Sequence, residues 1–266
     1  MEPSRVVYWN LEESWKLAFF IFASIALLIF LLGLWSRINI WTQGRDEENT
    51  LKGLGVAGLL WLSFKTFFSM DCILYRRLFT MSTFRGVMIL FIVWSFLILF
   101  IGTILTTLEH YLDLKIFLTG RGYLVFSLIL DIAGGLLIIG LVAALIRRYT
   151  TPVNRRISSL EDMAFLVLLL AVVVLGFAVE GLRLAIHAPP ALDWSPIGGA
   201  FTALFKALLQ SRESLLMAHK IAWIAHGVIA MIFVAYIPYS KIFHLFAAQI
   251  TTSLSSTLYG GVVREE

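Results

Sequence analysis

Five long apolar stretches constrain this chain more than any other feature of its sequence. They cover residues 17–35, 86–108, 123–146, 163–179 and 221–240. Each is close to or above the roughly 20 residues that a helix needs to cross the hydrocarbon core of a bilayer. Because 59% of the 266 residues are hydrophobic and 14% are charged, one soluble core could not bury them. The pattern predicts an all-α membrane protein, a bundle of five transmembrane helices, and excludes a soluble enzyme or a nucleic-acid binder.

Two further apolar stretches are too charged or too short to span. Residues 51–70 contain two lysines, and residues 197–209 contain one. Both predict amphipathic helices that lie at the membrane surface, although the first has the alternative of forming a sixth span. We expect residues 1–266 to form a single membrane domain, with a cytoplasmic tail at residues 251–266.

The distribution of basic residues favours one orientation of these helices. Thirteen of the 21 lysines and arginines fall in residues 36–85, 147–162 and 241–266, and eight fall in the segments on the opposite side. Cytoplasmic connections of membrane proteins carry an excess of Lys and Arg. The counts therefore place the N-terminus outside and the C-terminus in the cytoplasm.

Cysteine is almost absent from the chain, and Cys72 is the only one. One thiol excludes a disulfide framework and a zinc site ligated by several cysteines. It also excludes an iron–sulfur cluster held by this chain alone, because such clusters need several cysteine ligands. Any iron–sulfur chemistry linked to this protein therefore requires a partner that carries the cluster.

Three of the five histidines belong to the last apolar helix and its continuation, at His219, His226 and His244. At about 100° per residue, the step from His226 to His244 makes about five whole turns, and His219 lies within about 20° of the same line. The same step rises about 27 Å, close to the thickness of the hydrocarbon core. Two stacked b-type haems require imidazoles at two such depths. Interfacial or hydrogen-bonded core histidines are the alternative interpretation.

Short motifs surround these histidines. Trp223-Ile224-Ala225-His226, Ile237-Pro238-Tyr239-Ser240-Lys241 and His244 resemble the last helix of the respiratory nitrate reductase gamma subunit superfamily. The similarity extends over residues 65–245 through Asp71 with Arg76-Arg77, Leu99-Phe100-Ile101-Gly102-Thr103, Asp131 with Arg147-Arg148-Tyr149, Gly176-Phe177, and Glu180-Gly181 with Arg183. The chain looks closest to the membrane cytochrome b subunits of heterodisulfide-reductase-like menaquinol oxidoreductase complexes.

This resemblance implies a five-helix cytochrome of the prokaryotic cytoplasmic membrane that exchanges electrons between menaquinone and a cytoplasmic iron–sulfur protein. It implies that His226 is an axial ligand of the haem nearer the outside and His244 of the haem nearer the cytoplasm. The family usually carries a histidine where this chain has Ile89, and an aliphatic side chain cannot ligate iron. We therefore expect one outer haem b and leave a second haem open.

His110 is the only histidine on the second span, and it lies near the outer end. We expect it to pair with His226; a less favourable arrangement uses His219 in place of that ligand. His244 then has no obvious partner unless Met88 supplies a thioether, as in His/Met haems. The simpler interpretation is that Met88 packs among apolar side chains.

Three other ionisable residues are candidates for quinone and proton handling, because such residues inside a bilayer are costly and usually functional. Asp131 is expected either to take a proton from quinol or to pair with Arg183, with a hydrogen bond to Ser127 or to backbone as the alternative. Glu180 and Arg183 are three residues apart on one helix, which favours a local ion pair. Both could also hydrogen-bond a quinone carbonyl or a haem propionate.

The leading hypothesis is therefore a haem b electron-transfer subunit that reacts with quinone and anchors an iron–sulfur partner. The alternative is a haem-poor structural anchor or quinone-binding subunit, which Ile89 supports. An ion carrier that uses Asp131 and the histidines is a third possibility, but the chain lacks the internal repeat common in transporters.

Overall fold

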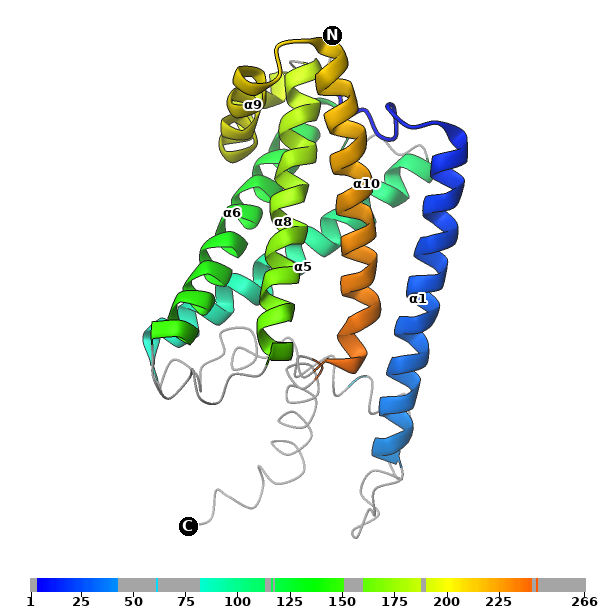
Figure 1. Cartoon of the computed structure of the whole chain (residues 1–266), viewed down its shortest axis with the longest axis vertical. Helices are drawn as coiled ribbons and strands as arrows, with labels where there is room; N and C mark the ends of the chain where they lie inside the picture. The colour runs from blue at the N-terminus through cyan, green and yellow to red at the C-terminus, as the bar shows by residue number, and fades with distance from the viewer. Residues whose placement is uncertain are drawn as a thin grey trace. The chain divides into compact units, whose positions relative to one another are not determined.

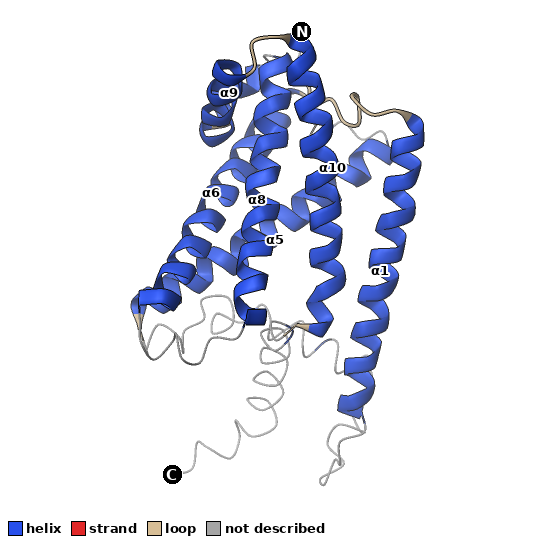
Figure 2. Ribbon diagram, in the orientation of Figure 1, coloured by secondary structure: helices blue, strands red, loops and turns tan. Residues whose placement is uncertain are grey.

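The computed structural model describes residues 4–42, 61, 82–112, 116, 118–150, 160–187, 190–240 and 243, and these residues form helices and connecting loops without a β-strand (Figures 1 and 2). The long helices are α1 (Glu13–Thr42), α5 (Thr83–Leu112), α6 (Gly120–Thr150), α8 (Leu160–His187) and α10 (Arg212–Tyr236). Among the described residues, five helices are long and apolar enough to cross a membrane. The predicted fold class and the multi-pass nature of the protein are confirmed.

The long helices extend beyond the predicted apolar spans, because polar residues continue them at both ends. Glu161 and Asp162 occupy the first turn of α8, and Arg147 and Arg148 occupy the last turn of α6. These charges oppose the partial charges of the helix termini. Arg148 and Asp162 also form an ion pair of 3.0 Å, which joins the two helix ends.

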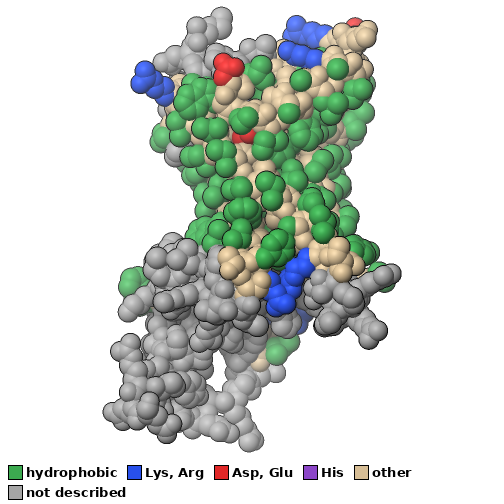
Figure 3. All heavy atoms as spheres, turned by 90° about the vertical axis from the view of Figure 1, so that its left-hand side faces the viewer, with side chains coloured by type: hydrophobic (Ala, Val, Ile, Leu, Met, Phe, Trp, Pro, Cys, Tyr) green, Lys and Arg blue, Asp and Glu red, His purple; other side chains and the backbone are tan. Residues whose placement is uncertain are grey.

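Hydrophobic side chains cover the middle of the face shown in Figure 3, and lysines and arginines gather toward its two ends. Side chains such as Ile129, Ile139 and Val167 are about half exposed within their helices. A soluble surface rarely exposes so many large apolar side chains together, whereas a surface that faces lipid requires them. This distribution agrees with helices that span a bilayer.

The chain divides into two compact units. The first comprises Met1–Ile25 and Met88–Phe233, and the second comprises Ala26–Val87 and Val234–Glu266. In the first unit, α6 packs closely against its neighbours through glycine. A Cβ atom on Gly134 would lie 2.6 Å from the Phe177 ring of α8, and one on Gly102 of α5 would lie 2.5 Å from Leu130 of α6. Glycine at these two positions leaves room for the side chains of the neighbouring helix.

The predicted helix at residues 197–209 is present as α9 (Pro196–Leu208), after the 3₁₀ helix η1 (Pro190–Trp194). One side of α9 is packed onto α8. A Cβ atom on Gly181 would lie 2.6 Å from Phe201, and the Thr202 hydroxyl donates a hydrogen bond of 3.0 Å to the Gly181 carbonyl. The predicted surface helix at residues 51–70, apart from residue 61, and the predicted tail at residues 251–266 lie outside the described residues.

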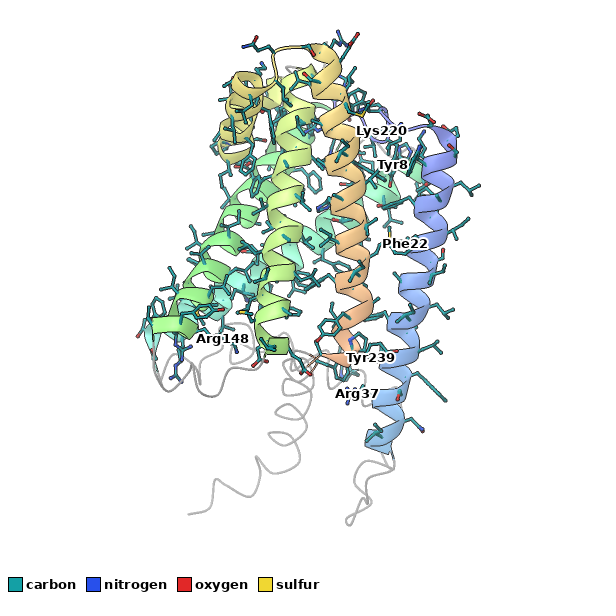
Figure 4. All side chains as sticks on the ribbon, in the orientation of Figure 1. Tyr8, Phe22, Arg37, Arg148, Lys220 and Tyr239 are labelled. Atoms are coloured by element: carbon teal, nitrogen blue, oxygen red, sulfur yellow. The ribbon has the colours of Figure 1, made fainter. Side chains whose placement is uncertain are left out.

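In the second unit, α1 contacts the 3₁₀ helix η2 (Ile237–Tyr239) that follows α10. The Arg37 Nε donates a hydrogen bond of 3.1 Å to the Pro238 carbonyl, and the Tyr239 hydroxyl donates one of 3.2 Å to the Ile29 carbonyl. A Cβ atom on Gly33 would lie 2.7 Å from Pro238, so glycine permits this contact. Figure 4 labels Arg37 and Tyr239.

Candidate functional site

The candidate site lies in the first unit, where α6 and α8 meet the first turn of α9. The Asp131 carboxylate accepts hydrogen bonds from the backbone N–H groups of Ile197 and Gly198, at 2.9 and 2.8 Å. Such N–H groups at a helix start have no partner within their own helix. In the described structure the N-cap residue Ser195 forms no capping hydrogen bond, and its hydroxyl instead contacts that of Ser127 at 2.8 Å. Asp131 therefore caps α9 from another helix.

Glu180 and Arg183 form the ion pair that their spacing predicts. Arg183 Nη2 lies 2.6 Å from one Glu180 oxygen, and Arg183 Nε lies 3.2 Å from the other. The Arg183 side chain is 6% exposed. A Cβ atom on Gly198 would lie 3.3 Å from Glu180 Cγ and 3.4 Å from Asp131 Oδ1. The structure therefore places Glu180 and Asp131 beside Gly198, where Arg183 pairs with Glu180 and Asp131 accepts from the backbone of α9 rather than from Arg183.

A second guanidinium reaches Glu180 from the N-terminal segment. Arg5 Nη2 lies 4.0 Å from Glu180 Oε2. The Arg5 backbone N–H donates a hydrogen bond of 2.8 Å to the Leu118 carbonyl, and Ser4 pairs with Thr119. Burial lowers the pKa of Arg5, while the Glu180 carboxylate opposes this shift. The sequence contains no local signal for this contact, because Arg5 and Glu180 are far apart along the chain.

Tyr123 is a second residue of the site that the sequence did not identify. It is fully buried in α6, at 0% exposure, and its hydroxyl makes no hydrogen bond within the described part of the chain. The Arg183 guanidinium carbon lies 5.8 Å from the centre of the Tyr123 ring, a cation–π distance. In the sequence, Tyr123 looks like an ordinary aromatic residue near the start of an apolar span.

The N-terminal strap, residues 4–11, runs across the same end of the first unit (Figure 4, label Tyr8). Trp9 of the strap packs between two histidines, with ring centres 4.3 Å from His187 and 5.1 Å from His219. The Asn10 side-chain N–H₂ donates a hydrogen bond of 2.8 Å to the Leu216 carbonyl and contacts His219 Nδ1 at 3.3 Å. With the amide in this orientation, Nδ1 of the neutral His219 ring accepts and the proton lies on Nε2.

His226 carries its ring proton on the other nitrogen. Its Nδ1 lies 3.0 Å from the Val172 carbonyl of α8, so Nδ1 carries the proton and donates. A Cβ atom on Gly176 would lie 3.3 Å from His226 Cε1, so the absence of a side chain there leaves room for the ring. The neutral ring therefore presents an unprotonated Nε2, the form that ligates a metal.

His110 packs on aromatic side chains at the end of α5. Its ring centre lies 5.2 Å from that of Tyr8 and 5.3 Å from that of Tyr111. Tyr8, which has a left-handed φ of 57°, also contacts Trp223 at 5.9 Å. The ring contacts of His110 in the described structure do not include His226, so its predicted pairing stays a prediction.

The remaining two ligand candidates have different outcomes. Met88 is buried, and its carbonyl lies 3.2 Å from the position of a Cβ atom on Gly140 of α6. His244 lies outside the described residues.

The two histidines of α10 differ in how well they fit haem. The orientation of His226 fits an axial haem ligand. His219 accepts a hydrogen bond at Nδ1, which does not fit the tautomer that binds iron through Nε2.

Comparison with known proteins adds a family to this geometry. The model of the nitrate reductase gamma subunit family matches residues 114–256. The chain is 26% identical to the EtfAB:quinone oxidoreductase of Syntrophomonas wolfei subsp. wolfei. The similarity covers 93% of this chain but 34% of that longer protein. It is 28% and 24% identical to one subunit of the dihydromethanophenazine:CoB–CoM heterodisulfide reductases of Methanosarcina barkeri and Methanosarcina thermophila, over 95% and 96% of those two proteins. No solved structure matches.

Proposed function

The chain belongs to the nitrate reductase gamma subunit family, and from this premise we propose that it is a membrane-anchoring haem b subunit. In this proposal it exchanges electrons between menaquinone or menaquinol and a cytoplasmic iron–sulfur partner of a respiratory complex. One similar protein is named a quinone oxidoreductase, and two are named for dihydromethanophenazine. These names support the proposal that the chain reacts with a redox carrier dissolved in the membrane, such as a quinone.

The observation that supports haem most is the tautomer of His226. A backbone carbonyl holds the Nδ1–H, and Nε2 is left as the lone-pair donor. A haem ligated there would supply one-electron chemistry at an iron whose ligand orientation is set by α8. His110 is the proposed second ligand, and His219 is a weaker candidate because its Nδ1 accepts from Asn10. A second haem on His244, with Met88 as a weak candidate opposite, stays open.

We assign quinone and proton handling to the residues around Gly198. Oxidation of a quinol to a quinone releases two electrons, which the proposed haem would pass to the iron–sulfur partner, and two protons, so the site needs acceptors for both protons and a donor that orients the ring. Glu180 is the proposed acceptor and Arg183 the donor that orients the headgroup. Asp131 holds the first turn of α9 beside Glu180 and is the second candidate for accepting a proton.

The proposed orientation places the N-terminus outside and the C-terminus in the cytoplasm of a prokaryotic cell. The excess of Lys and Arg in the predicted cytoplasmic segments supports it. With one cysteine, the chain cannot by itself hold an iron–sulfur cluster. The proposed partner is therefore a cytoplasmic, heterodisulfide-reductase-like iron–sulfur protein.

The haem proposal is tested by a dithionite-reduced minus oxidised spectrum of protein purified from a haem-replete host. We expect about one b-type haem per chain, lost in His226→Ala and retained in His244→Ala. His187→Ala is the matched control, since His187 packs on Trp9 at an exposed helix end. If the wild type shows no b-type band, the alternative applies, a haem-poor anchor or quinone-binding subunit.

A further inference from the structure

One face of α6 carries three buried polar side chains, Tyr123, Ser127 and Asp131, at intervals of four residues. Side chains spaced in this way lie one above another on a helix. The Ser127 hydroxyl contacts that of Ser195, and the Asp131 carboxylate accepts two backbone N–H groups of α9. Tyr123 is different, because its hydroxyl makes no hydrogen bond in the described structure.

Among the described residues, no side chain accepts a hydrogen bond from the Tyr123 hydroxyl. Arg183 lies against the Tyr123 ring, but a guanidinium can only donate. The Glu180 carboxylate receives Arg183, and the Asp131 carboxylate receives the backbone N–H groups of Ile197 and Gly198; neither forms a hydrogen bond with the Tyr123 hydroxyl in the described structure. A buried hydroxyl without an acceptor is costly, so its retention calls for an explanation such as an acceptor that a ligand provides.

We propose that the Tyr123 hydroxyl donates a hydrogen bond to a carbonyl oxygen of the quinone headgroup. Tyr123 then acts as a binding and specificity residue beside Arg183, and the hydroxyl finds its acceptor only when quinone is bound. This inference rests on the proposed function, because it assumes that quinone binds at the Glu180–Arg183 pair. It adds a residue and an atom-level contact that neither the spacing of charges nor the histidine pattern identifies.

The surroundings of Tyr123 suit a flat ring with a polar edge. Leu184 forms a buried apolar cluster with it, and Leu124 and Leu192 pack against that cluster. Binding sites for such ligands combine mainly apolar walls with few polar groups that fix orientation. The headgroup has to displace part of this packing. Leu192 is the side chain that comes from the short η1 segment rather than from a long helix.

The test compares wild-type protein with Tyr123→Phe, which removes only the hydroxyl, both in lipid nanodiscs. The probe is a 1,4-naphthoquinone with a short isoprenyl tail, and its Kd is measured by quenching of tryptophan fluorescence. We expect Tyr123→Phe to weaken binding about 3- to 10-fold, as the loss of one net hydrogen bond predicts. The infrared C=O band of bound quinone should also move toward the position of an unbonded carbonyl.

Thermal unfolding separates this role from a structural one. Because the hydroxyl has no partner in the described part of the protein, Tyr123→Phe should unfold at the same temperature as the wild type or higher. Tyr149→Phe is the matched control, since its hydroxyl donates to the Met163 sulfur near the other end of α6. That variant should bind the probe like the wild type.

Each outcome separates this inference from the proposed function. If wild-type protein binds no naphthoquinone, the proposed quinone function fails. If the wild type binds but Tyr123→Phe binds equally well, with the same C=O band, only the present inference fails. A lower unfolding temperature for Tyr123→Phe would also overturn the inference, because it would mean that the hydroxyl has a partner within the protein.

Discussion

His226 and His219 lie seven residues apart on α10, but their surroundings differ. His226 contacts a neighbouring helix through one backbone carbonyl, at a place where Gly176 leaves room for its ring. His219 lies at the end covered by the N-terminal strap and meets an asparagine side chain. The first environment is a backbone carbonyl of a closely packed neighbouring helix, and the second is an amide side chain of the N-terminal strap. Identical residues on one helix therefore acquire opposite tautomers from their neighbours.

The largest expected effect concerns the ion pair of Glu180 and Arg183, near the end of the first unit that the N-terminal strap covers. Arg183→Ala leaves the Glu180 carboxylate, whose side chain is 19% exposed, with Arg5, at 4.0 Å, as its remaining ion-pair partner among the described residues. Removing one partner of a fully buried ion pair costs about 3–5 kcal/mol, and for this partly buried pair we expect a loss of about 3 kcal/mol of unfolding free energy. The measurement is the midpoint of thermal unfolding in detergent. Lys220→Ala is the control, because its partner Glu12 is exposed and so stays hydrated. A shift as small as that of Lys220→Ala would contradict the importance of the Arg183 pair.

The next effect concerns the cap of α9. Asp131→Asn replaces one acceptor oxygen by an N–H₂ group that faces the N–H of Ile197 or Gly198. The unsatisfied pair should lower the unfolding free energy by about 1–2 kcal/mol. Thermal unfolding measures this loss. Thr103→Ala is the control, since its exposed hydroxyl donates to the Leu99 carbonyl within its own helix. Equal stability of Asp131→Asn and wild type would indicate that Asp131 does not hold α9.

A smaller effect is expected in the packed environment of His226. In Gly176→Ala, a Cβ atom 3.3 Å from His226 Cε1 requires the ring, held by its hydrogen bond to Val172, to move by a few tenths of an ångström, at a net cost of about 1 kcal/mol. If His226 ligates haem, the visible spectrum of the reduced protein should change as well. Gly199→Ala is the control, because its Cβ meets neighbours only at 3.7 Å. A variant with normal stability and spectrum would show that space at residue 176 is unimportant.

The smallest effect distinguishes the two histidines directly. Asn10→Ala removes the contact to His219 Nδ1 and the hydrogen bond to Leu216, at a cost of about 1 kcal/mol. Imidazole ¹⁵N chemical shifts should show His219 protonated at Nε2 in haem-free wild-type protein and as a mixture of tautomers in the variant. The shifts of His226 should stay the same in both. A wild-type His219 protonated at Nδ1 would refute the contrast between the two sites.

Much of the fold followed from local patterns. The apolar runs predicted the five long helices, and the spacing of Glu180 and Arg183 predicted their ion pair. Both patterns act within one helix, where neighbours in sequence are neighbours in space. The partners of Asp131 could not be predicted in the same way, because Ile197 and Gly198 lie 66 and 67 residues further along the chain.

By itself, the sequence determined that this chain enters a membrane as helices and that few ionisable side chains lie within them. Hydropathy identifies the segments that enter the bilayer. These segments form helices, because a helix satisfies its own backbone hydrogen bonds where no water is present. The tertiary structure alone decided which nitrogen of His226 and His219 carries the proton, that Arg5 reaches Glu180, and that Tyr123 has no acceptor among the described residues. These properties depend on single atoms contributed by distant segments, and no periodicity in the sequence encodes their meeting.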